Sequence, residues 1–262
     1  MTEKYTAELK TVGAEFEASL VLLRKLFELK SLNLLEVDLY ENNLMLKRSR
    51  HRIKRFYEVI KRRYLSEFNK HDYVQLPLLD ALQHLSKEES VSLLYFHLCL
   101  SDKILYDFVK EVAYPRYVKG FLGVSNEDSE AFLISSSEIH EEMKDWTDRT
   151  YKDLKSALIT VLCEVGFLKN RKNPQFNEEL FISHRVFGYL LYFNMDYIQS
   201  LNDVYDHDDF KLFFLDKQQR KLMIKELKNS GVIHLEEQKE TIIDYKFPSL
   251  KEFVVQYVIG KD

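Results

Sequence analysis

One short segment concentrates the side chains that are best suited to binding phosphate. The run KRSRHRIKRFYEVIKRR, from Lys47 to Arg63, holds nine Lys or Arg among seventeen residues and a single acid, Glu58, in a chain whose net charge is −4. Clustered Lys and Arg bind a nucleic-acid backbone because neutralising its phosphates releases condensed counterions. The segment therefore predicts a nucleic-acid contact. An acidic protein partner and a merely solvated surface are the alternative interpretations.

The spacing of apolar residues predicts that this run is a helix with one buried face. Its apolar residues recur at helical spacing: Ile53, Phe56, Tyr57, Ile60 and Tyr64. Ser49 stands where an N-cap belongs. Solvated helices normally mix Glu with Lys, and this one hardly does. We predict that double-stranded DNA is contacted by Arg48, Arg50, Arg52, Lys54, Arg55, Lys61, Arg62 and Arg63.

The pattern near the C-terminus predicts a helix followed by a β-hairpin. Asp216 can cap this helix and Gly231 can close it. Two runs of strand-forming residues, 232–235 and 241–247, follow around a short charged turn. Helix, glycine, strand, turn and strand is an order typical of a winged helix, whose recognition helix often enters the major groove of DNA.

Lysines on that helix predict a second contact with DNA. Lys217, Lys221 and Lys228 fall along one stripe of it at helical spacing, with Lys225 beside them. We assign Lys217, Lys221 and Lys225 to the contact. The neighbouring hairpin is acidic, with Glu236 and Glu237 in its expected turn. Carboxylates within a Debye length of about 8 Å repel a phosphate backbone. We therefore predict that the C-terminal unit serves partner proteins as much as DNA.

Searches for catalytic motifs find none. The chain contains no GxGxxG, GxxxxGK[ST], HExxH or GxSxG pattern. His207-Asp-Asp brings potential metal ligands together, but it lacks a second ligand at metal-binding spacing, and a solvated acidic loop is the simpler interpretation. We expect a binding protein that has no enzymatic activity, no metal, no cofactor and no small-molecule substrate.

Composition predicts a mainly α protein. Hydrophobic residues make up 45% of the 262 positions, which suffices for a sizeable core, and seven Gly with four Pro leave few breaks between helices. We predict multi-helical N-terminal and middle regions, 1–68 and 69–174, and a C-terminal winged-helix-like unit with a small β-hairpin, 175–262. No apolar run is long enough to span a membrane and no signal peptide is evident, so we expect a cytoplasmic protein.

Local patterns also place several helix ends. Apolar residues predict a first helix over about 12–30. Thr150 to Asp153 resembles a capping box that opens a later helix, and Gly166 is expected to end it. In the first 68 residues, the basic helix is the third of three, which matches the outline of a helix-turn-helix but also that of many small bundles.

The order of these parts resembles the BrxA family of BREX phage-defence systems. The resemblance rests on ENNLMLKRSRHRIKRFYEVIKRR, on LPLLDALQHLSKEES with SDKILYDFV, and on WTDRTYKDLKSALITVLCEVGFLKN, where Trp146, Thr150 and Gly166 stand at the expected positions. It implies a small, non-enzymatic, DNA-binding accessory protein encoded beside the BREX methyltransferase, phosphatase-like and ATPase components. The predicted contacts above rest on charge and periodicity, because no DNA-contacting residue of the family is matched position by position.

Charge, periodicity and this resemblance together predict double-stranded DNA binding with little sequence preference, in support of a bacterial anti-phage complex. Other BREX components are then further partners. Two alternatives remain open: an assembly adaptor whose basic helix docks on an acidic protein, and an RNA-binding helical protein.

Overall fold

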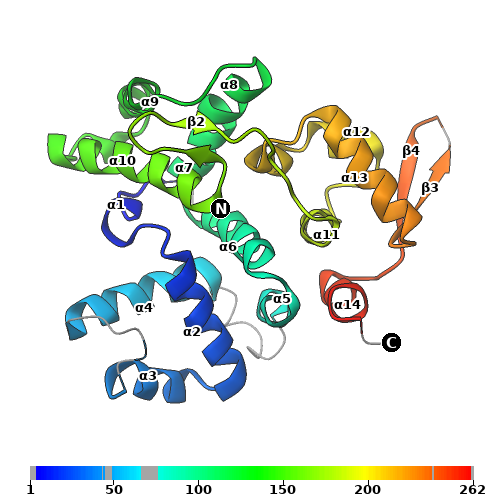
Figure 1. Cartoon of the computed structure of the whole chain (residues 1–262), viewed down its shortest axis with the longest axis horizontal. Helices are drawn as coiled ribbons and strands as arrows, with labels where there is room; N and C mark the ends of the chain where they lie inside the picture. The colour runs from blue at the N-terminus through cyan, green and yellow to red at the C-terminus, as the bar shows by residue number, and fades with distance from the viewer. Residues whose placement is uncertain (1–3, 43, 45–48, 66–75, 238, 261–262) are drawn as a thin grey trace.

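The chain folds mainly into helices, with two small antiparallel hairpins (Figure 1). The computed structural model describes residues 4–42, 44, 49–65, 76–237 and 239–260. The N-terminal region holds α1 (Leu9–Val12), α2 (Phe16–Leu29), α3 (Leu32–Tyr40) and α4 (Arg50–Tyr64). The predicted mainly α class is thus confirmed.

The middle region is a longer series of helices that ends in the first hairpin. Its elements are α5 (Pro77–His84), α6 (Lys87–Ser101), α7 (Lys103–Phe108), the π-helical turn η2 (Val109–Ala113), α8 (Tyr114–Val118), α9 (Asn126–Ile139), η3 (Glu141–Met143), α10 (Asp148–Val165), β1 (Leu168–Lys169) and β2 (Gln175–Phe176). The strands β1 and β2 pair antiparallel.

The C-terminal region combines short helices with the second hairpin. Its elements are α11 (His184–Phe193), α12 (Leu201–Asp206), η4 (Asp208–Phe213), α13 (Lys217–Asn229), β3 (Ile233–Glu237), β4 (Thr241–Tyr245), α14 (Leu250–Phe253) and η5 (Val254–Val258). β3 and β4 are antiparallel, with Ile233 opposite Tyr245 and Glu237 opposite Thr241. The predicted hairpin is confirmed, with ends that differ by up to two residues.

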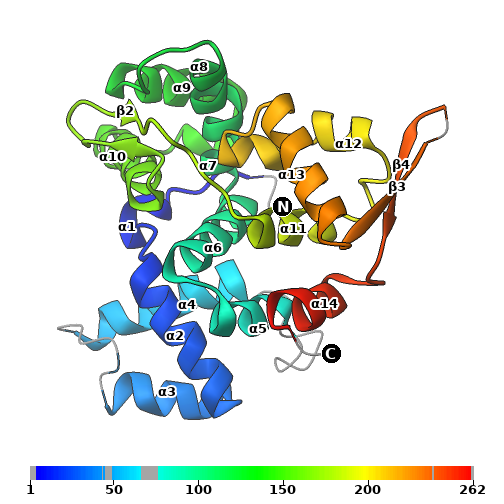
Figure 2. The same cartoon turned by 45° about the vertical axis from the view of Figure 1, so that its right-hand side comes forward.

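Helices α6 and α7 run through the middle of the molecule, and the other regions surround them (Figures 1 and 2). The helices α2, α3 and α4 lie on one side, and α8, α9 and α10 lie on another. The C-terminal region lies opposite these, and its last turn, η5, returns to contact α5. The basic helix α4 and the lysine-bearing helix α13 therefore sit at separate ends of the protein.

An aromatic cluster fastens the C-terminal region to the middle one. Phe213 and Phe214, just before α13, are 3% and 0% exposed. Phe213 meets Tyr95 of α6 edge-on with ring centroids 5.6 Å apart, and Phe214 meets Phe167 at 5.0 Å. Such pairs add about 0.5–1.5 kcal/mol each beyond the area that they bury. The segment that leads into α13 is therefore anchored in the core.

Two predicted helix boundaries are wrong. The first helix, expected over about 12–30, is α2 and begins only at Phe16, because the chain leaves α1 at Gly13 with a left-handed φ of 68°. The helix assigned to a Thr150 cap begins one turn earlier, since Thr147 Oγ1 accepts a hydrogen bond from Thr150 N at 3.3 Å. The predicted end at Gly166 is confirmed, with a φ of 90°.

Candidate nucleic-acid interface

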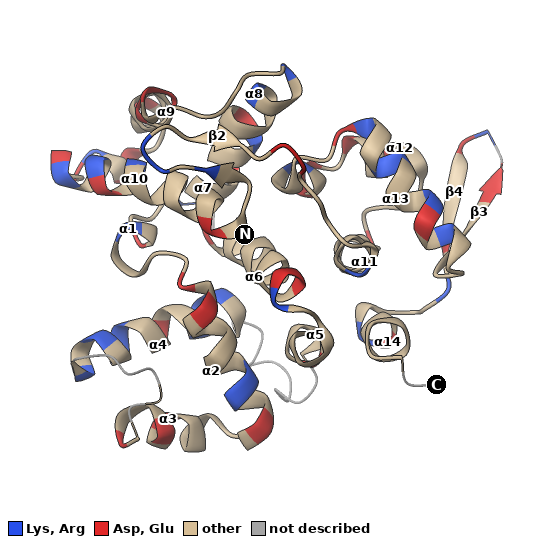
Figure 3. Cartoon of the chain, viewed as in Figure 1, with Lys and Arg blue, Asp and Glu red and all other residues tan. Residues whose placement is uncertain are grey.

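Helix α4 is held in place by its apolar face. Ile53, Phe56 and Ile60 are buried, and the helix packs on α1, α3 and α6. Ser49 Oγ accepts a hydrogen bond from Arg52 N at 3.3 Å, so the helix begins where the sequence predicts. Lys and Arg are spread along α4 (Figure 3), and Arg50, Arg52, Lys54, Arg55 and Arg62 are exposed.

The first half of α4 presents unneutralised positive charge. Arg50, Arg52, Lys54 and Arg55 are exposed, and none forms an ion pair with another residue that the structure describes. Cations near a helix N-terminus oppose the helix dipole, at a cost of roughly 0.3–1 kcal/mol each. Helix stability therefore does not account for Arg50 and Arg52. Arg48, the remaining predicted contact in this half, lies outside the described residues.

The second half of α4 has acidic partners within the protein. Lys61 Nζ lies 3.0 Å from Glu58 Oε1 and 4.6 Å from the centroid of the Tyr57 ring. Arg62 pairs with Glu8, which precedes α1. These contacts compensate part of the charge that the sequence assigns to DNA. The predicted surface is therefore concentrated in the first half of the helix.

The prediction that Arg63 contacts DNA is contradicted by its burial. Its exposed fraction is 4%, and its Nη1 donates a hydrogen bond of 2.7 Å to the Gly13 carbonyl. The physical reason is helical phase: Arg63 stands three residues after Ile60 and seven after Phe56, which places it on the buried face. Arg63 fastens α4 to the turn between α1 and α2 instead.

Asp102, the N-cap of α7, lies near Arg63 and carries a testable pH dependence. Burial raises the pKa of its carboxyl to about 6, although the Arg63 guanidinium lowers it. A folded-state pKa above the ordinary 3.8 means that the folded protein holds this proton to higher pH. The residue's contribution to stability is therefore complete below about pH 4 and is lost as the pH rises through about 6.

Replacing Asp102 by Asn should remove this pH dependence. The Asn side chain can still accept the capping hydrogen bond from Leu105 N, now 3.2 Å long, without a buried charge. We expect Asp102→Asn to be more stable than the wild type by on the order of 2 kcal/mol above pH 7, and no more stable at pH 4. Denaturant unfolding of both proteins between pH 4 and pH 8 measures the difference, and a constant difference would contradict the assignment.

The lysines of α13 also reach the surface. Lys217, Lys221 and Lys225 are exposed, and Lys217 Nζ lies 3.2 Å from Asp206 Oδ1. That ion pair is itself open to solvent, with 72% and 76% of the two side chains exposed. Exposed pairs are weak, so Lys217 remains able to bind phosphate.

The hairpin beside α13 carries exposed carboxylates, and one of them also makes hydrogen bonds within the protein. Glu240 Oε1 accepts hydrogen bonds from Ser200 Oγ at 2.8 Å and from Asn202 Nδ2 at 2.6 Å. This carboxylate therefore belongs to the start of α12. Glu236, Glu237 and Glu240 are all exposed. The hairpin therefore presents the acidic surface that its sequence predicts.

A residue that the sequence analysis missed sets the position of α13. Arg220 is 1% exposed, and its guanidinium donates hydrogen bonds to four main-chain carbonyls. The acceptors, at 2.9–3.1 Å, are Leu215, Val204, Tyr205 and His207. Arg220 stands four residues before buried Ile224, and that helical spacing is the signal that could have identified it.

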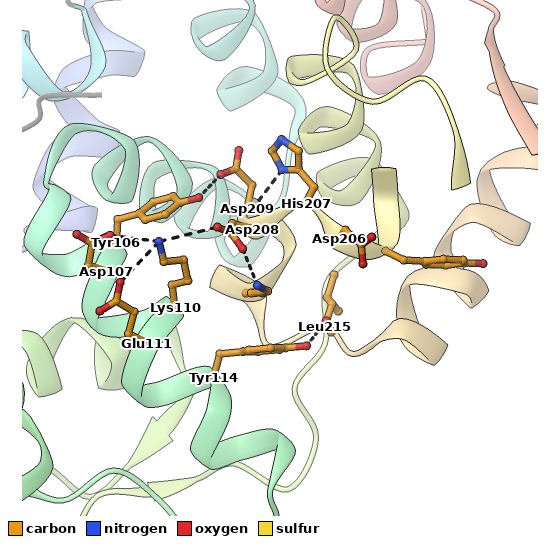
Figure 4. A network of polar contacts seen from close by, with 12 residues as sticks. Tyr106, Asp107, Lys110, Glu111, Tyr114, Asp206, His207, Asp208, Asp209 and Leu215 are labelled. Carbon is orange, nitrogen blue, oxygen red and sulfur yellow. Dashed lines mark hydrogen bonds and ion pairs between the residues drawn. The ribbon is translucent and has the colours of Figure 1, made fainter. Parts of the chain in front are cut away.

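A buried polar network joins η4, the segment before α13, to α7 (Figure 4). The carboxylate of Asp209 is buried and accepts hydrogen bonds from Tyr106 Oη at 2.8 Å and from Asn194 Nδ2 at 2.9 Å. The interpretation of residues 207–209 as a solvated acidic loop is therefore wrong for Asp209. The role of Asp209 is structural, because its two carboxylate oxygens hold α7 and the C-terminal end of α11 against η4.

Neither a metal site nor a membrane span is found in the described part of the chain. Within those residues, no group of three or more His, Cys, Asp or Glu side chains could hold a metal ion. Over the same ranges, every helix is too short or too polar to cross a bilayer.

Comparisons with known proteins point to one family. A family model described as BrxA matches residues 3–192. A curated protein, BREX protein BrxA from Bacillus cereus (strain H3081.97), is 27% identical over 95 residues, 36% of this chain. The match spans about half of that relative, 48% of its length. The crystal structure of an uncharacterized protein from Magnetospirillum magneticum aligns with a TM-score of 0.63 and 16% identity, over 80% of this chain and 98% of that one, which shows a shared fold.

Proposed function

Because the chain belongs to the BrxA family, we propose that it serves a BREX phage-defence system as a non-enzymatic, cytoplasmic protein that binds double-stranded DNA. One observation carries the DNA-binding part of the proposal. The first half of α4 exposes Arg50, Arg52, Lys54 and Arg55 without an acidic partner among the described residues. A surface of this kind gains free energy when phosphates replace small counterions.

The C-terminal region supports a second contact, through a winged-helix interpretation. A single β-bridge joins Ser200 to Ile242, and Ile243 N donates a 2.9 Å hydrogen bond to the Gln199 carbonyl, so the segment before α12 lies beside β4. With this bridge in the place of a first strand, the order α11, bridge, α12, η4, α13, β3 and β4 resembles that of a winged helix. In that fold α13 occupies the position of the recognition helix.

Binding to different nucleic acids separates this proposal from its alternatives. We expect the full chain to bind duplex DNA more tightly than duplex RNA or single-stranded DNA of equal length. The affinity should fall steeply with salt, because each neutralised phosphate adds about 0.9 to the slope of log K against log salt. Anisotropy titrations at several salt concentrations measure both quantities. Tighter binding of duplex RNA would favour the RNA-binding alternative, and no binding to any of the three would favour an assembly adaptor.

The acidic end of the β3–β4 hairpin supports the alternative function, that of an assembly adaptor. Glu237 and Lys239 are exposed there, and a winged helix with such an end suits a protein partner better than a phosphate backbone. Other BREX components are the natural candidates. A co-purification that is abolished by Glu237→Lys, with duplex binding unchanged, would assign the hairpin to proteins and leave α4 to DNA.

Absence of chemistry is part of the proposal and has its own test. We expect protein purified without added ions to contain no stoichiometric metal and to leave duplex DNA intact in the presence of magnesium. No motif for a nucleophile, metal cluster or phosphate loop occurs in the sequence. Stoichiometric zinc, or cleavage that persists through further purification, would contradict a purely binding role.

A further inference from the structure

The outer lines of α4 and α13, the solvent-facing edges opposite their buried faces, carry different kinds of side chain. At about 100° per residue, the surface of α4 opposite its buried face carries His51, Arg55 and Arg62. The corresponding line of α13 carries Gln218, Leu222 and Asn229, all exposed. The α4 line suits a uniform phosphate backbone. The α13 line offers an amide, an apolar surface and a second amide.

The lysines of α13 flank this line rather than forming it. Lys217, Lys221 and Lys228 stand about 100–140° around the helix from Leu222, and Lys225 about 60°. Charge therefore lies to one side of a nearly neutral outer edge. A helix that enters the major groove needs this division, because its flank meets phosphates while its outer edge meets bases.

We propose that α13 reads base edges in the major groove, with Gln218 on an adenine and Leu222 against a thymine methyl group. A glutamine amide can donate to adenine N7 and accept from adenine N6, and an aliphatic side chain packs on the thymine methyl. This inference rests on the proposed function. It adds a preference for A·T pairs at the site of α13, where the sequence predicts little sequence preference.

The positions of the two residues along α13 fit this role. Gln218 and Leu222 lie in the first half of α13, the part of a recognition helix that contacts base edges. They are one helical turn apart, about 6 Å along the axis, which is just under two base-pair steps. Leu222 is 56% exposed, so its apolar surface is free to make the contact.

Neighbouring charges limit the contact to this half of the helix. Glu226 lies about 40° from the same line, one turn after Leu222, and it repels phosphate there. Arg220, on the opposite face, holds α13 against the end of α12. The helix is therefore presented as a rigid element, and its second half faces less of the groove.

Modified bases test the two contacts separately. A pool of randomised duplexes is first selected on the full chain, and we expect the selected sites to share adjacent A·T pairs. Deoxyuridine then replaces thymidine, which removes only the 5-methyl group, and 7-deazaadenine replaces adenine, which removes N7. Each change should weaken wild-type binding about tenfold, the scale of a single good base contact.

Matched variants assign each effect to its residue. Leu222→Ala should bind thymine and uracil sites equally, and Gln218→Ala should bind adenine and 7-deazaadenine sites equally. The flanking control Lys221→Ala should weaken all these duplexes by the same factor while keeping both discriminations. Both test residues are exposed, so the variants should fold as the wild type does.

The possible failures are distinguishable. Duplex binding that shows no shared sequence and no response to either modified base would overturn base reading by α13 and leave DNA binding intact. Base reading would also be overturned if Leu222→Ala kept the full thymine preference, or if its only defect were loss of a partner protein. A full chain that binds no duplex at all would overturn the proposed function together with this inference.

Discussion

Replacing both Arg52 and Arg55 by glutamate is expected to weaken duplex DNA binding by on the order of 100-fold at 0.1 M salt. Each neutralised phosphate contributes about 8-fold at that salt, because log K falls by about 0.9 per contact and decade of salt. The two new carboxylates add repulsion. The salt slope should flatten by about 1.8. Anisotropy titrations across a salt series measure both the affinity and the slope.

The choice of these two arginines follows from their surroundings. Both are exposed on the first half of α4 and form no ion pair with another described residue. Their replacement should therefore leave α4 folded. The unfolding temperature should rise slightly, because Arg52→Glu removes a cation near the helix N-terminus and places Glu three residues after the Ser49 cap. Arg62 is less suitable because it pairs with Glu8, so its reversal would disturb the fold as well as the surface.

A second double charge reversal, on another helix, tests whether the location of the lost charge or only the net charge of the protein determines the affinity for DNA. Arg149→Glu with Lys152→Glu makes the same charge change on the exposed surface of α10, where the 3.6 Å ion pair of Arg149 with Asp153 is open to solvent and therefore weak. It should reduce affinity only a few-fold, through the general field of the protein. Equal losses in the two double variants would mean that net charge alone drives binding. A folded α4 variant with wild-type affinity would remove the helix from the interface.

The C-terminal lysines give a second comparison. Lys217→Glu with Lys221→Glu should cost less affinity than the change on α4, because Asp206 already lies beside Lys217 and the acidic hairpin follows α13. The two double variants must be measured in one buffer. If the C-terminal pair proves the more damaging, the roles assigned to α4 and α13 are reversed.

Local signals in the sequence were sufficient for most helix ends near the candidate site. Ser49 caps α4, and Asp216 with Gln219 forms the capping box of α13, because a cap depends on residues within one turn. The β3–β4 hairpin follows from a similar short-range pattern. The bridge between Ser200 and Ile242 was not predicted, because a single β-bridge carries no periodicity.

Two arginines show where charge misled the prediction. Arg63 was assigned to the DNA-binding surface from its charge and from a position beside the apolar face, and Arg220 was not considered, yet both are buried and bind main-chain carbonyls. The carbonyl that Arg63 binds, at Gly13, is fifty residues away, and no local pattern reveals it. The helical phase of both residues was visible in the sequence. For a long cationic side chain, phase is therefore a better guide to burial than charge.

Arg220 leads to the largest expected effect on stability. Its Nη1 donates to the carbonyls of Val204 and Tyr205 at 3.0 and 2.9 Å, at the end of α12. Its Nε donates to the Leu215 carbonyl, just before α13. The last carbonyls of a helix lack intrahelical partners and carry its negative dipole end, so a buried guanidinium satisfies both needs. One side chain thus fixes α12 relative to α13.

Arg220→Met keeps the length and removes every donor, so it should lower the free energy of unfolding by about 3 kcal/mol or more. The exposed neighbour in Lys221→Met should change it by less than about 0.5 kcal/mol. Denaturant unfolding measures both, and hydrogen exchange should show the loss of protection in α12 and α13 first. Duplex binding through α4 should largely survive, because α4 lies at the other end of the molecule (Figure 1). Wild-type stability in Arg220→Met would mean that the four carbonyls find other donors and that Arg220 does not position the helix.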